Sequence, residues 1–269
     1  MLANTIPIQS IDDERIAAYT SVRERDLTRG HGSRFIVEGK VTLDALLTTS
    51  HFLPESVFIE MRRLGPLGEL LSRVPDTVPI YTAPQTLMDD IVGFPIHRGV
   101  LACARKGTLP DTDELLSSTR TVLCLVGLSN HDNIGACFRN GAAFGADAVL
   151  LDETCGDPLY RKSIRVSAGA ALSLPFAHDR SANALFDSLA MNGFETWCLT
   201  PHASAIPLGT MQRPEKLALV LGAEGPGLPD DLIARGTAIR IPMVEGFDSI
   251  NVATAGAIAM STVLTPGEA

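Results

Sequence analysis

Three segments of the chain place amides, glycines and charged side chains where they could support chemistry. In the first, N-I-G-A-C-F-R-N-G-A-A-F-G at 133–145, Arg139 is the one cation in a run of small and apolar residues. Ile134, Cys137, Phe138, Gly141 and Gly145 share one helical stripe, which leaves Arg139 on another face. Two interpretations of Arg139 stay open: a functional group, or a surface or interface arginine paired with a carboxylate.

The second segment, L-A-L-V-L-G-A-E-G-P-G-L-P at 217–229, is an apolar strand that runs into a turn with three glycines around Glu224. Glycine lets backbone amides approach a ligand closely, so a side chain at Gly222 would fill ligand space. The spacing is not G-x-G-x-x-G and follows a late strand, which argues against a dinucleotide site of the Rossmann kind. A purely structural tight turn is the alternative.

The third segment, A-I-R-I-P-M-V-E-G-F-D-S-I-N-V at 238–252, predicts a strand ending at Met243 and then a polar loop. The loop carries Ser249 and Asn251, either of which could simply cap the following helix. That helix, from 250 to 264, is rich in alanine and glycine and could approach another backbone closely, inside the domain or across a dimer interface.

These segments must be positioned by alternating strands and helices. From 14 to 106, short β-type runs such as R-F-I-V-E-G alternate with helical ones, and 107–118 is predicted as a linker that could end in a short helix. From 119 to 269 the apolar strand candidates T-V-L-C-L-V-G-L, A-V-L-L-D, S-L-P-F-A, T-W-C-L-T, L-A-L-V-L-G and A-I-R-I-P-M are separated by helical segments. The fold class is therefore α/β, with a parallel sheet in the larger second domain.

The composition limits what the chain can bind. Its 269 residues carry 22 basic and 31 acidic side chains, so the net charge of −9 has the wrong sign for holding nucleic acid by bulk electrostatics. Five scattered cysteines read as reduced core residues, and neither cysteine nor histidine spacing predicts a metal site. No apolar run is long enough for a membrane span, and no signal peptide is evident, so a cytoplasmic location is expected.

Taken together, the three segments resemble a known family. N-I-G-x-x-x-R-N-x-x-x-F-G at 133–145, V-L-G-A-E-G-x-G-L at 220–228 and I-P-M-x-x-x-x-x-S-I-N-V at 241–252 are similar to the three motifs of the SpoU/TrmH RNA ribose 2′-O-methyltransferases, in the same order. The segment R-K-S-I-R-V-S-A-G-A-A-L-S-L-P-F at 161–176 also resembles one that these enzymes carry between the first two motifs. Ile250 stands where leucine is usual, an exchange that keeps an apolar contact.

The resemblance implies a C-terminal domain with a deep trefoil knot that binds S-adenosylmethionine. The implied cofactor-binding residues are Leu199, Thr200, Gly222, Glu224, Gly227, Ile241, Met243, Ile250 and Val252. The implied catalytic residues are Asn133 and Arg139, with Glu224, Ser249 and Asn251 supporting Arg139 and the cofactor.

The resemblance also extends to the first domain, 1–106, which is similar to the ribosomal-protein-like domain that binds substrate RNA in many relatives. From Ser21 to Lys40 there are five basic and three acidic side chains plus His31; a solvated loop of mixed charge is the other interpretation. The implied RNA-binding residues are Arg23, Arg25, Arg29, Arg34, Arg161, Lys162 and Arg165. The implied substrate is tRNA or rRNA.

The family also implies a homodimer. Two other functions stay open: a non-catalytic RNA- or ribosome-binding protein that kept the fold, and a small-molecule α/β enzyme that uses a nucleotide.

Overall fold

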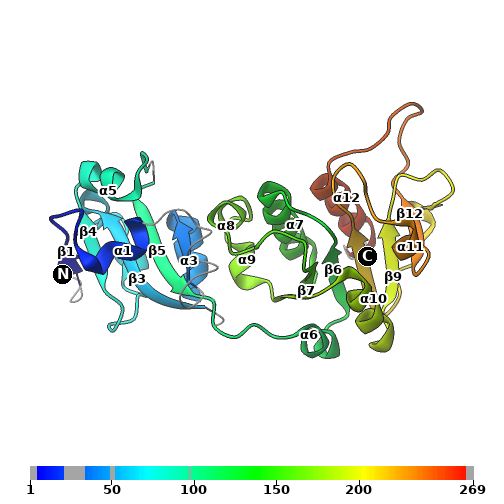
Figure 1. Ribbon diagram of the computed structural model, residues 1–269, viewed down its shortest axis with the longest axis horizontal. Helices are drawn as coiled ribbons and strands as arrows, with labels where there is room; N and C mark the ends of the chain where they lie inside the picture. The colour runs from blue at the N-terminus through cyan, green and yellow to red at the C-terminus, as the bar shows by residue number, and fades with distance from the viewer. Residues whose placement is uncertain (1–4, 21–33, 49–51, 97, 265–269) are drawn as a thin grey trace. The chain divides into compact units, whose positions relative to one another are not determined.

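Two α/β units make up the described part of the chain (Figure 1). The computed structural model describes residues 5–20, 34–48, 52–96 and 98–264. The first unit comprises Met1–Thr108 and Leu159–Ser173, and the second comprises Leu109–Pro158 and Leu174–Ala269. The first unit's main stretch ends at Thr108, inside the predicted linker 107–118. The main difference from the prediction is that residues 159–173, expected in the second domain, group with the first unit.

The first unit is built on a five-stranded mixed sheet in the order β1-β4-β3-β5-β2. β5 runs antiparallel to β2 and β3, whereas β4 runs parallel to β1 and β3. The short strand β1 has no counterpart among the predicted strands. The elements of this unit are β1 (Thr5–Pro7), η1 (Glu14–Ile16), α1 (Ala17–Thr20), β2 (Arg34–Glu38), α3 (Lys40–Thr48), β3 (Leu53–Glu60), η2 (Met61–Arg63), α4 (Gly68–Leu71), β4 (Ile80–Ala83), α5 (Gln85–Val92), β5 (Val100–Arg105), α8 (Arg161–Val166) and α9 (Ala170–Ser173).

Helices α8 and α9 belong to the first unit because of specific tertiary contacts. Arg161 Nη1 donates to Glu38 Oε2 at the end of β2, at 2.5 Å. A Cβ on Gly169 would lie only 2.7 Å from Ala45 Cβ in α3, so this glycine permits close packing. A sequence pattern shows that a helix forms but not which distant element it packs against.

The second unit contains a seven-stranded sheet in the order β10-β12-β9-β11-β6-β7-β8. Every strand pair in it is parallel, which confirms the predicted parallel sheet. The knot stays a prediction. The elements are α6 (Thr112–Ser118), β6 (Thr121–Leu125), α7 (His131–Phe144), β7 (Ala148–Asp152), β8 (Phe176–Arg180), α10 (Ala182–Met191), β9 (Glu195–Leu199), β10 (Ile206–Pro207), η3 (Leu208–Thr210), β11 (Leu217–Leu221), α11 (Asp230–Ile233), β12 (Thr237–Arg240) and α12 (Val252–Leu264).

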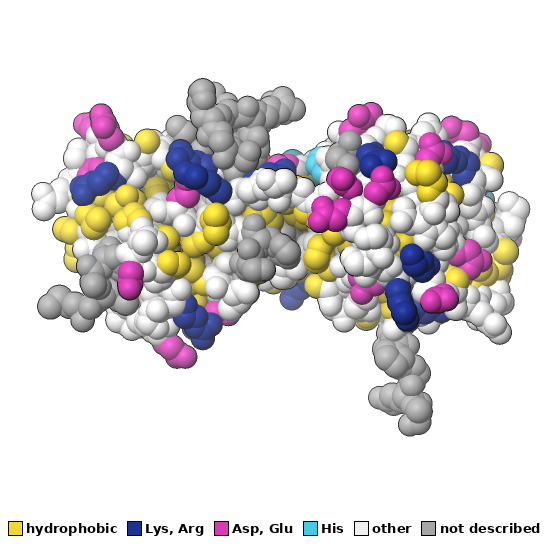
Figure 2. Space-filling model, turned by 90° about the horizontal axis from the view of Figure 1, so that it is seen from below, with side chains coloured by type: hydrophobic (Ala, Val, Ile, Leu, Met, Phe, Trp, Pro, Cys, Tyr) yellow, Lys and Arg dark blue, Asp and Glu magenta, His cyan; other side chains and the backbone are white. Residues whose placement is uncertain are grey.

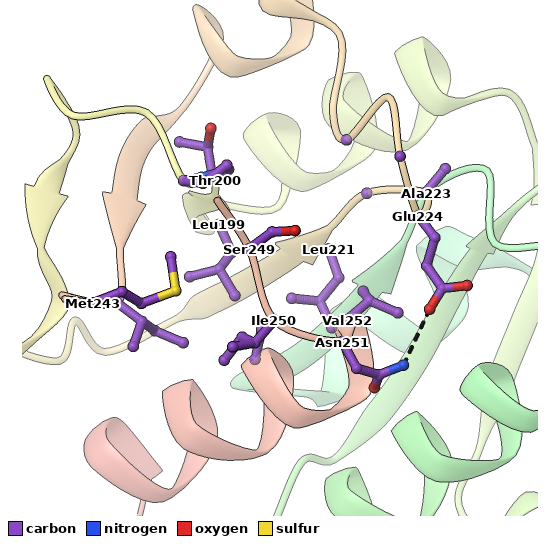
Figure 3. Close-up of a pocket in the computed structure, with 16 residues that line it drawn as sticks. Leu199, Thr200, Leu221, Ala223, Glu224, Met243, Ser249, Ile250, Asn251 and Val252 are labelled. Carbon is purple, nitrogen blue, oxygen red and sulfur yellow. Dashed lines mark hydrogen bonds between the residues drawn. The ribbon is translucent and has the colours of Figure 1, made fainter. Parts of the chain in front are cut away.

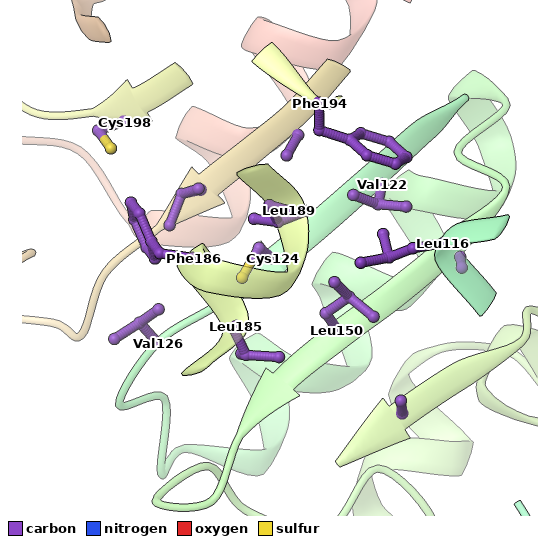
Figure 4. Close-up of a cluster of buried hydrophobic side chains, with 14 of the residues drawn as sticks. Leu116, Val122, Cys124, Val126, Leu150, Leu185, Phe186, Leu189, Phe194 and Cys198 are labelled. Atoms are coloured by element: carbon purple, nitrogen blue, oxygen red, sulfur yellow. The ribbon is translucent and has the colours of Figure 1, made fainter. Parts of the chain in front are cut away.

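The central strands are apolar except at Thr121 and Asp152, at the strand ends, because both faces of the sheet are covered. All residues of β6, β7 and β11 are buried. Val122 and Cys124 of β6 join a cluster with α10 residues such as Leu185 and Leu189 (Figure 4). Leu123 points to the opposite face, where a Cβ on Gly141 of α7 would lie 3.9 Å from it. Because successive side chains of a strand point to opposite faces, the central strands contribute to two hydrophobic cores, one on each face of the sheet.

All five cysteines are free and buried, which confirms their prediction as reduced core residues. Burial raises the pKa of the Cys137 thiol to about 12 and that of Cys198 to about 11. Thiols with such pKa values are poor nucleophiles at neutral pH. The cysteines therefore contribute packing rather than reactivity.

Helix α7 begins two residues before the motif segment 133–145. Asn130 is its N-cap, and its Oδ1 accepts from Asp132 N at 2.9 Å. The predicted strand before it ends at Leu125 rather than Leu128. Asn130, Asp132 and Asn133 could each cap this helix, so the sequence alone does not select one.

Helix α12 turns its small residues inward. Ala253, Gly256 and Ala259 are buried, and a Cβ on Gly256 would lie 2.7 Å from Leu221 Cδ1 in β11. These small residues therefore pack inside the second unit, and a dimer interface at α12 stays a prediction. Among large hydrophobic side chains of α12, Ile258 is the exposed one, at 40%.

No helix within the described ranges is long and apolar enough to span a membrane. Within those same ranges, no three His, Cys, Asp or Glu side chains gather as metal ligands would.

Candidate functional site

A cavity of about 350 Å³ opens at the carboxyl ends of β9, β11 and β12 (Figure 3). Its floor is the ends of these parallel strands, and its sides are the loop after β11, the segment after β12 and the first turn of α12. In parallel α/β sheets, ligands bind at the carboxyl ends of strands because the loops that follow converge there. The volume is within the range of small-ligand pockets.

The residues that line the cavity come from three distant stretches of the chain. All nine residues predicted to bind the cofactor are among them, together with Ser249 and Asn251. Figure 3 shows Leu199, Leu221 and Ile250 giving the cavity an apolar wall. The prediction missed the other lining residues, which are adjacent to motif positions or on the next helical turn: Pro201, Leu221, Ala223, Gly225 and Ala255.

Gly222 lines the cavity, but a side chain there would meet the protein rather than a ligand. A Cβ on it would lie 2.5 Å from Gly227 C, and closer still to Leu228 N, so it would collide with the loop's own backbone. Gly227 N donates to Ala223 O at 3.0 Å, which closes the loop over Gly222. Gly225 and Gly227 adopt positive φ values of 89° and 70°. The glycines therefore shape the loop itself, and the expectation that a side chain at position 222 would fill ligand space is wrong.

Asn251 joins the three motif segments through its side-chain amide. Its Nδ2 donates to Asn133 Oδ1 at 2.9 Å and to Glu224 Oε1 at 3.1 Å. Its Oδ1 accepts from Ala253 N and Thr254 N, at 3.0 and 3.2 Å, and so caps α12. Both ends of the amide are used, which fixes its orientation. Asn251, and not Ser249, is therefore the cap of α12, and a functional role of Asn251 stays a prediction.

Helix α7 is attached to α12 at two polar points. Asn133 is 6% exposed and receives the Asn251 amide, whereas Asn140 Nδ2 donates to Ala253 O at 2.9 Å. Residues 133 and 140 are two helical turns apart and share one face. Arg139 lies next to Asn140, so these contacts fix the backbone that carries its guanidinium.

The comparisons with known proteins agree with this geometry. The profile of the SpoU rRNA Methylase family matches residues 120–261. An uncharacterized tRNA/rRNA methyltransferase of Mycobacterium bovis is 38% identical over 256 residues, which are 92% of this chain and 88% of that protein.

The chain belongs to the SpoU rRNA methylase family.

Solved structures show that the fold is shared over nearly the whole chain. An AdoMet-bound rRNA methyltransferase from Sinorhizobium meliloti superposes with a TM-score of 0.78 at 19% identity, covering 96% of this chain and 97% of that one. An RNA 2′-O ribose methyltransferase superposes with a TM-score of 0.74 at 23% identity, covering 96% and 97%. These likenesses confirm the predicted α/β fold.

In this SpoU family member, Arg139 is exposed and does not line the cavity of its own chain. Within the described residues it has no hydrogen bond or ion pair, so no pairing with a carboxylate is seen among them. Ser249, Glu224 and Asn251 do not contact it by a hydrogen bond, so the expected support of Arg139 by these groups is absent within one chain. Ser249 is exposed at the cavity rim.

The predicted RNA-binding residues of the SpoU family chain fall into different surroundings. Arg23, Arg25 and Arg29 lie outside the described residues. Arg34 Nε pairs with Glu55 at 2.5 Å. Arg161 pairs with Glu38, Arg165 lies 3.9 Å from the same carboxylate, and Lys162 is exposed. All four described residues belong to the first unit.

Proposed function

We propose that the protein transfers a methyl group from S-adenosylmethionine to a ribose 2′-hydroxyl of tRNA or rRNA. The observation that carries this proposal is the cavity in which all nine expected cofactor residues meet, with the Asn133–Asn251–Glu224 hydrogen bonds at its side. Methyl transfer to RNA is supported by the match to an RNA methylase family. Transfer to the ribose 2′-hydroxyl is supported by the likeness to a solved RNA 2′-O ribose methyltransferase.

The cavity fits this cofactor by the chemistry of its walls. The apolar side chains of Leu199, Ile241 and Ile250 suit the faces of an adenine ring, and main-chain groups of the strand ends and glycine loop can fix its edge. Glu224 is the one acidic side chain among the lining residues and can accept hydrogen bonds from the cofactor's polar groups. Bound there, S-adenosylmethionine would supply an electrophilic methyl group on its sulfonium.

The ribose oxygen must then approach the methyl carbon in line with the breaking bond and lose its proton. Arg139 cannot be the base, because a guanidinium stays protonated in proteins. We assign it instead to clamp the phosphate next to the ribose and to stabilise the developing alkoxide. The proton would pass to phosphate or to water, and both acceptors stay open.

Asn133, Asn251 and Glu224 act as positioning residues in this proposal. A carboxylate acceptor strengthens the hydrogen bond from the Asn251 amide, and buried Asn133 ties that amide to α7. The first turn of α12, the glycine loop and α7 are thereby held in one arrangement around the cavity.

We further propose a homodimer in which Arg139 serves the cavity of the partner. The support is that Arg139 is exposed, is without a partner in the described residues and does not line its own cavity. An arginine built rigidly onto α7 without an internal partner is suited to meet a ligand held by a second copy.

Sedimentation at micromolar concentration should therefore give about twice the chain mass of 28.6 kDa. Isologous association is expected because a twofold axis completes two sites at once. A monomer that still methylates RNA would refute both the dimer and the shared site.

The reaction is tested by calorimetric titration with S-adenosylmethionine and by transfer of labelled methyl groups to total RNA. Digestion of the product RNA to nucleosides and mass spectrometry should show 2′-O-methylated nucleosides. Methyl groups on bases alone would overturn the ribose assignment. RNA binding without transfer would support the non-catalytic alternative, and nucleotide binding without RNA binding would support a small-molecule enzyme.

The RNA class is tested with RNA from a strain in which the gene has been deleted. Such RNA lacks the modification and should accept label in one fraction, tRNA or rRNA, whereas the same fraction from the parent strain should not. Label in neither fraction would overturn the proposed substrate.

A further inference from the structure

Two glutamates are buried at the end of the first unit's sheet where β2 and β3 stop and β5 begins. Glu38 is 7% exposed and Glu60 is 6% exposed. Glu38 and Phe58 both pair with Leu101 of β5, and Glu60 is two residues beyond Phe58, so the register puts the two side chains on one face. Buried carboxylates need cationic or hydrogen-bonding partners.

Four arginines gather at this end of the sheet, and we call Arg63, Arg98, Arg161 and Arg165 the arginine cluster. Arg161 and Arg165 lie 2.5 and 3.9 Å from Glu38. A Cβ on Gly99 would lie 2.7 Å from Arg63 Nε and 2.9 Å from Glu60 Cβ, which places these side chains together. A Cβ on Gly39 would lie 3.0 Å from Arg98 Cδ.

The cluster places four guanidinium groups near two buried glutamates, Glu38 and Glu60, in a chain whose net charge is −9. On the face that Figure 2 shows, Lys and Arg side chains form separate groups among acidic and hydrophobic ones, without a continuous basic track. A local cluster of this kind is what an acidic protein needs to hold a polyanion.

Arg161 is the internal member of the cluster. Its side chain is 20% exposed, it pairs with Glu38, and its Cζ lies 4.7 Å from the centroid of the Phe94 ring. Such a guanidinium anchors α8 to the sheet and compensates a buried charge. It is therefore a positioning residue rather than a ligand contact.

Arg98 and Arg165 are the members available to a ligand. Arg98 is exposed and, within the described residues, has no hydrogen bond or ion pair. Its stem lies across Gly39, whose φ of 102° and lack of a side chain make the approach possible. The Arg165 side chain is 42% exposed, and its 3.9 Å separation from Glu38 leaves its donors incompletely used.

We infer that the arginine cluster is a phosphate-binding surface for substrate RNA, with Arg98 and Arg165 making the contacts. The inference rests on the proposed function and deepens it by naming where the first unit holds RNA. A guanidinium presents a planar fork that matches two phosphate oxygens, and a stem held against backbone loses less freedom on binding. Phosphate contacts of this kind position RNA without reading its sequence.

The test compares Arg98→Ala, Arg165→Ala and the double variant with the native chain. The probe is bulk bacterial tRNA, with binding followed by fluorescence anisotropy over a series of salt concentrations. Each single variant should bind about 3- to 10-fold more weakly, and each lost contact should lower the log–log salt slope by about 1. Arg98→Lys should keep the slope, because the charge is retained.

Arg73→Ala is the matched control, since Arg73 is a 47% exposed arginine of the same unit and pairs with Asp44 at 2.8 Å. It should leave the affinity for tRNA and the slope unchanged. Native affinity and slope in the double variant would overturn the inference. If the native chain binds tRNA through these arginines but transfers no methyl group, the proposed function fails while the RNA surface stands.

Discussion

Replacement of Arg139 by alanine should lower the rate of methyl transfer at least about 100-fold at saturating cofactor and RNA, while cofactor affinity stays within a few-fold. The rate should fall without a matching loss of cofactor affinity because Arg139 does not line the cavity of its own chain and is assigned to stabilise the transition state. Stability should hardly change, because Arg139 is exposed and no hydrogen bond or ion pair within the described residues depends on it.

Two further variants sharpen this experiment. Arg139→Lys keeps the charge but not the planar fork, so it should recover only part of the rate. Arg120→Ala removes an exposed arginine just before β6, at the opposite end of the sheet from the cavity, and should act as the native chain does. Normal turnover of Arg139→Ala together with lost cofactor affinity would contradict the transition-state role.

The lining of the cavity could be predicted from sequence because it depends on local patterns and one general rule. Leu199, Gly222 and Ile241 each directly follow or end an apolar run, and such runs become parallel strands whose carboxyl ends meet at one edge. The resemblance to the family motifs then singled out which of the converging loops mattered. Leu221 was missed because, in an apolar strand, it looks like an ordinary core residue. Ala255 was missed because it looks like an ordinary helix residue.

What could not be predicted are contacts between residues far apart in sequence. The pair Arg161–Glu38 spans 123 positions, and it is this pairing that groups α8 with the first unit. Arg161 in a basic segment looks like an RNA contact until the buried carboxylate beside it is known. Likewise, the small residues of α12 suggest a close neighbour, but only the structure shows that Leu221 of the same chain is that neighbour.

Substitution of Gly222 by alanine should weaken S-adenosylmethionine binding at least about 10-fold. The first atom of any side chain at this position would collide with the backbone of Gly227 and Leu228, so the loop must move and the cavity wall with it. Calorimetric titration measures the loss. Thermal unfolding should show a decrease in midpoint of several degrees, because the displaced loop also loses the hydrogen bond from Gly227 N to Ala223 O.

Gly209→Ala is the control for the glycine exchange itself. Gly209 lies in the same unit, has no positive φ, and a Cβ there would have no atom within 4 Å. It should bind the cofactor as the native chain does. Native cofactor affinity in Gly222→Ala would show that the cofactor site does not depend on this loop.

At a limiting cofactor concentration, where Gly222→Ala subunits take up little cofactor, the two impaired variants together test whether Arg139 acts on the partner's cavity. Co-expression of Arg139→Ala and Gly222→Ala subunits with different affinity tags allows the heterodimer to be isolated. In that heterodimer the Arg139→Ala subunit keeps a sound cavity and receives the intact Arg139 of its partner, so one site of two should work and the rate should be about half that of the native dimer. If Arg139 instead acted within its own chain, neither subunit would hold both an intact arginine and a sound cavity, and the heterodimer would be as inactive as its parents.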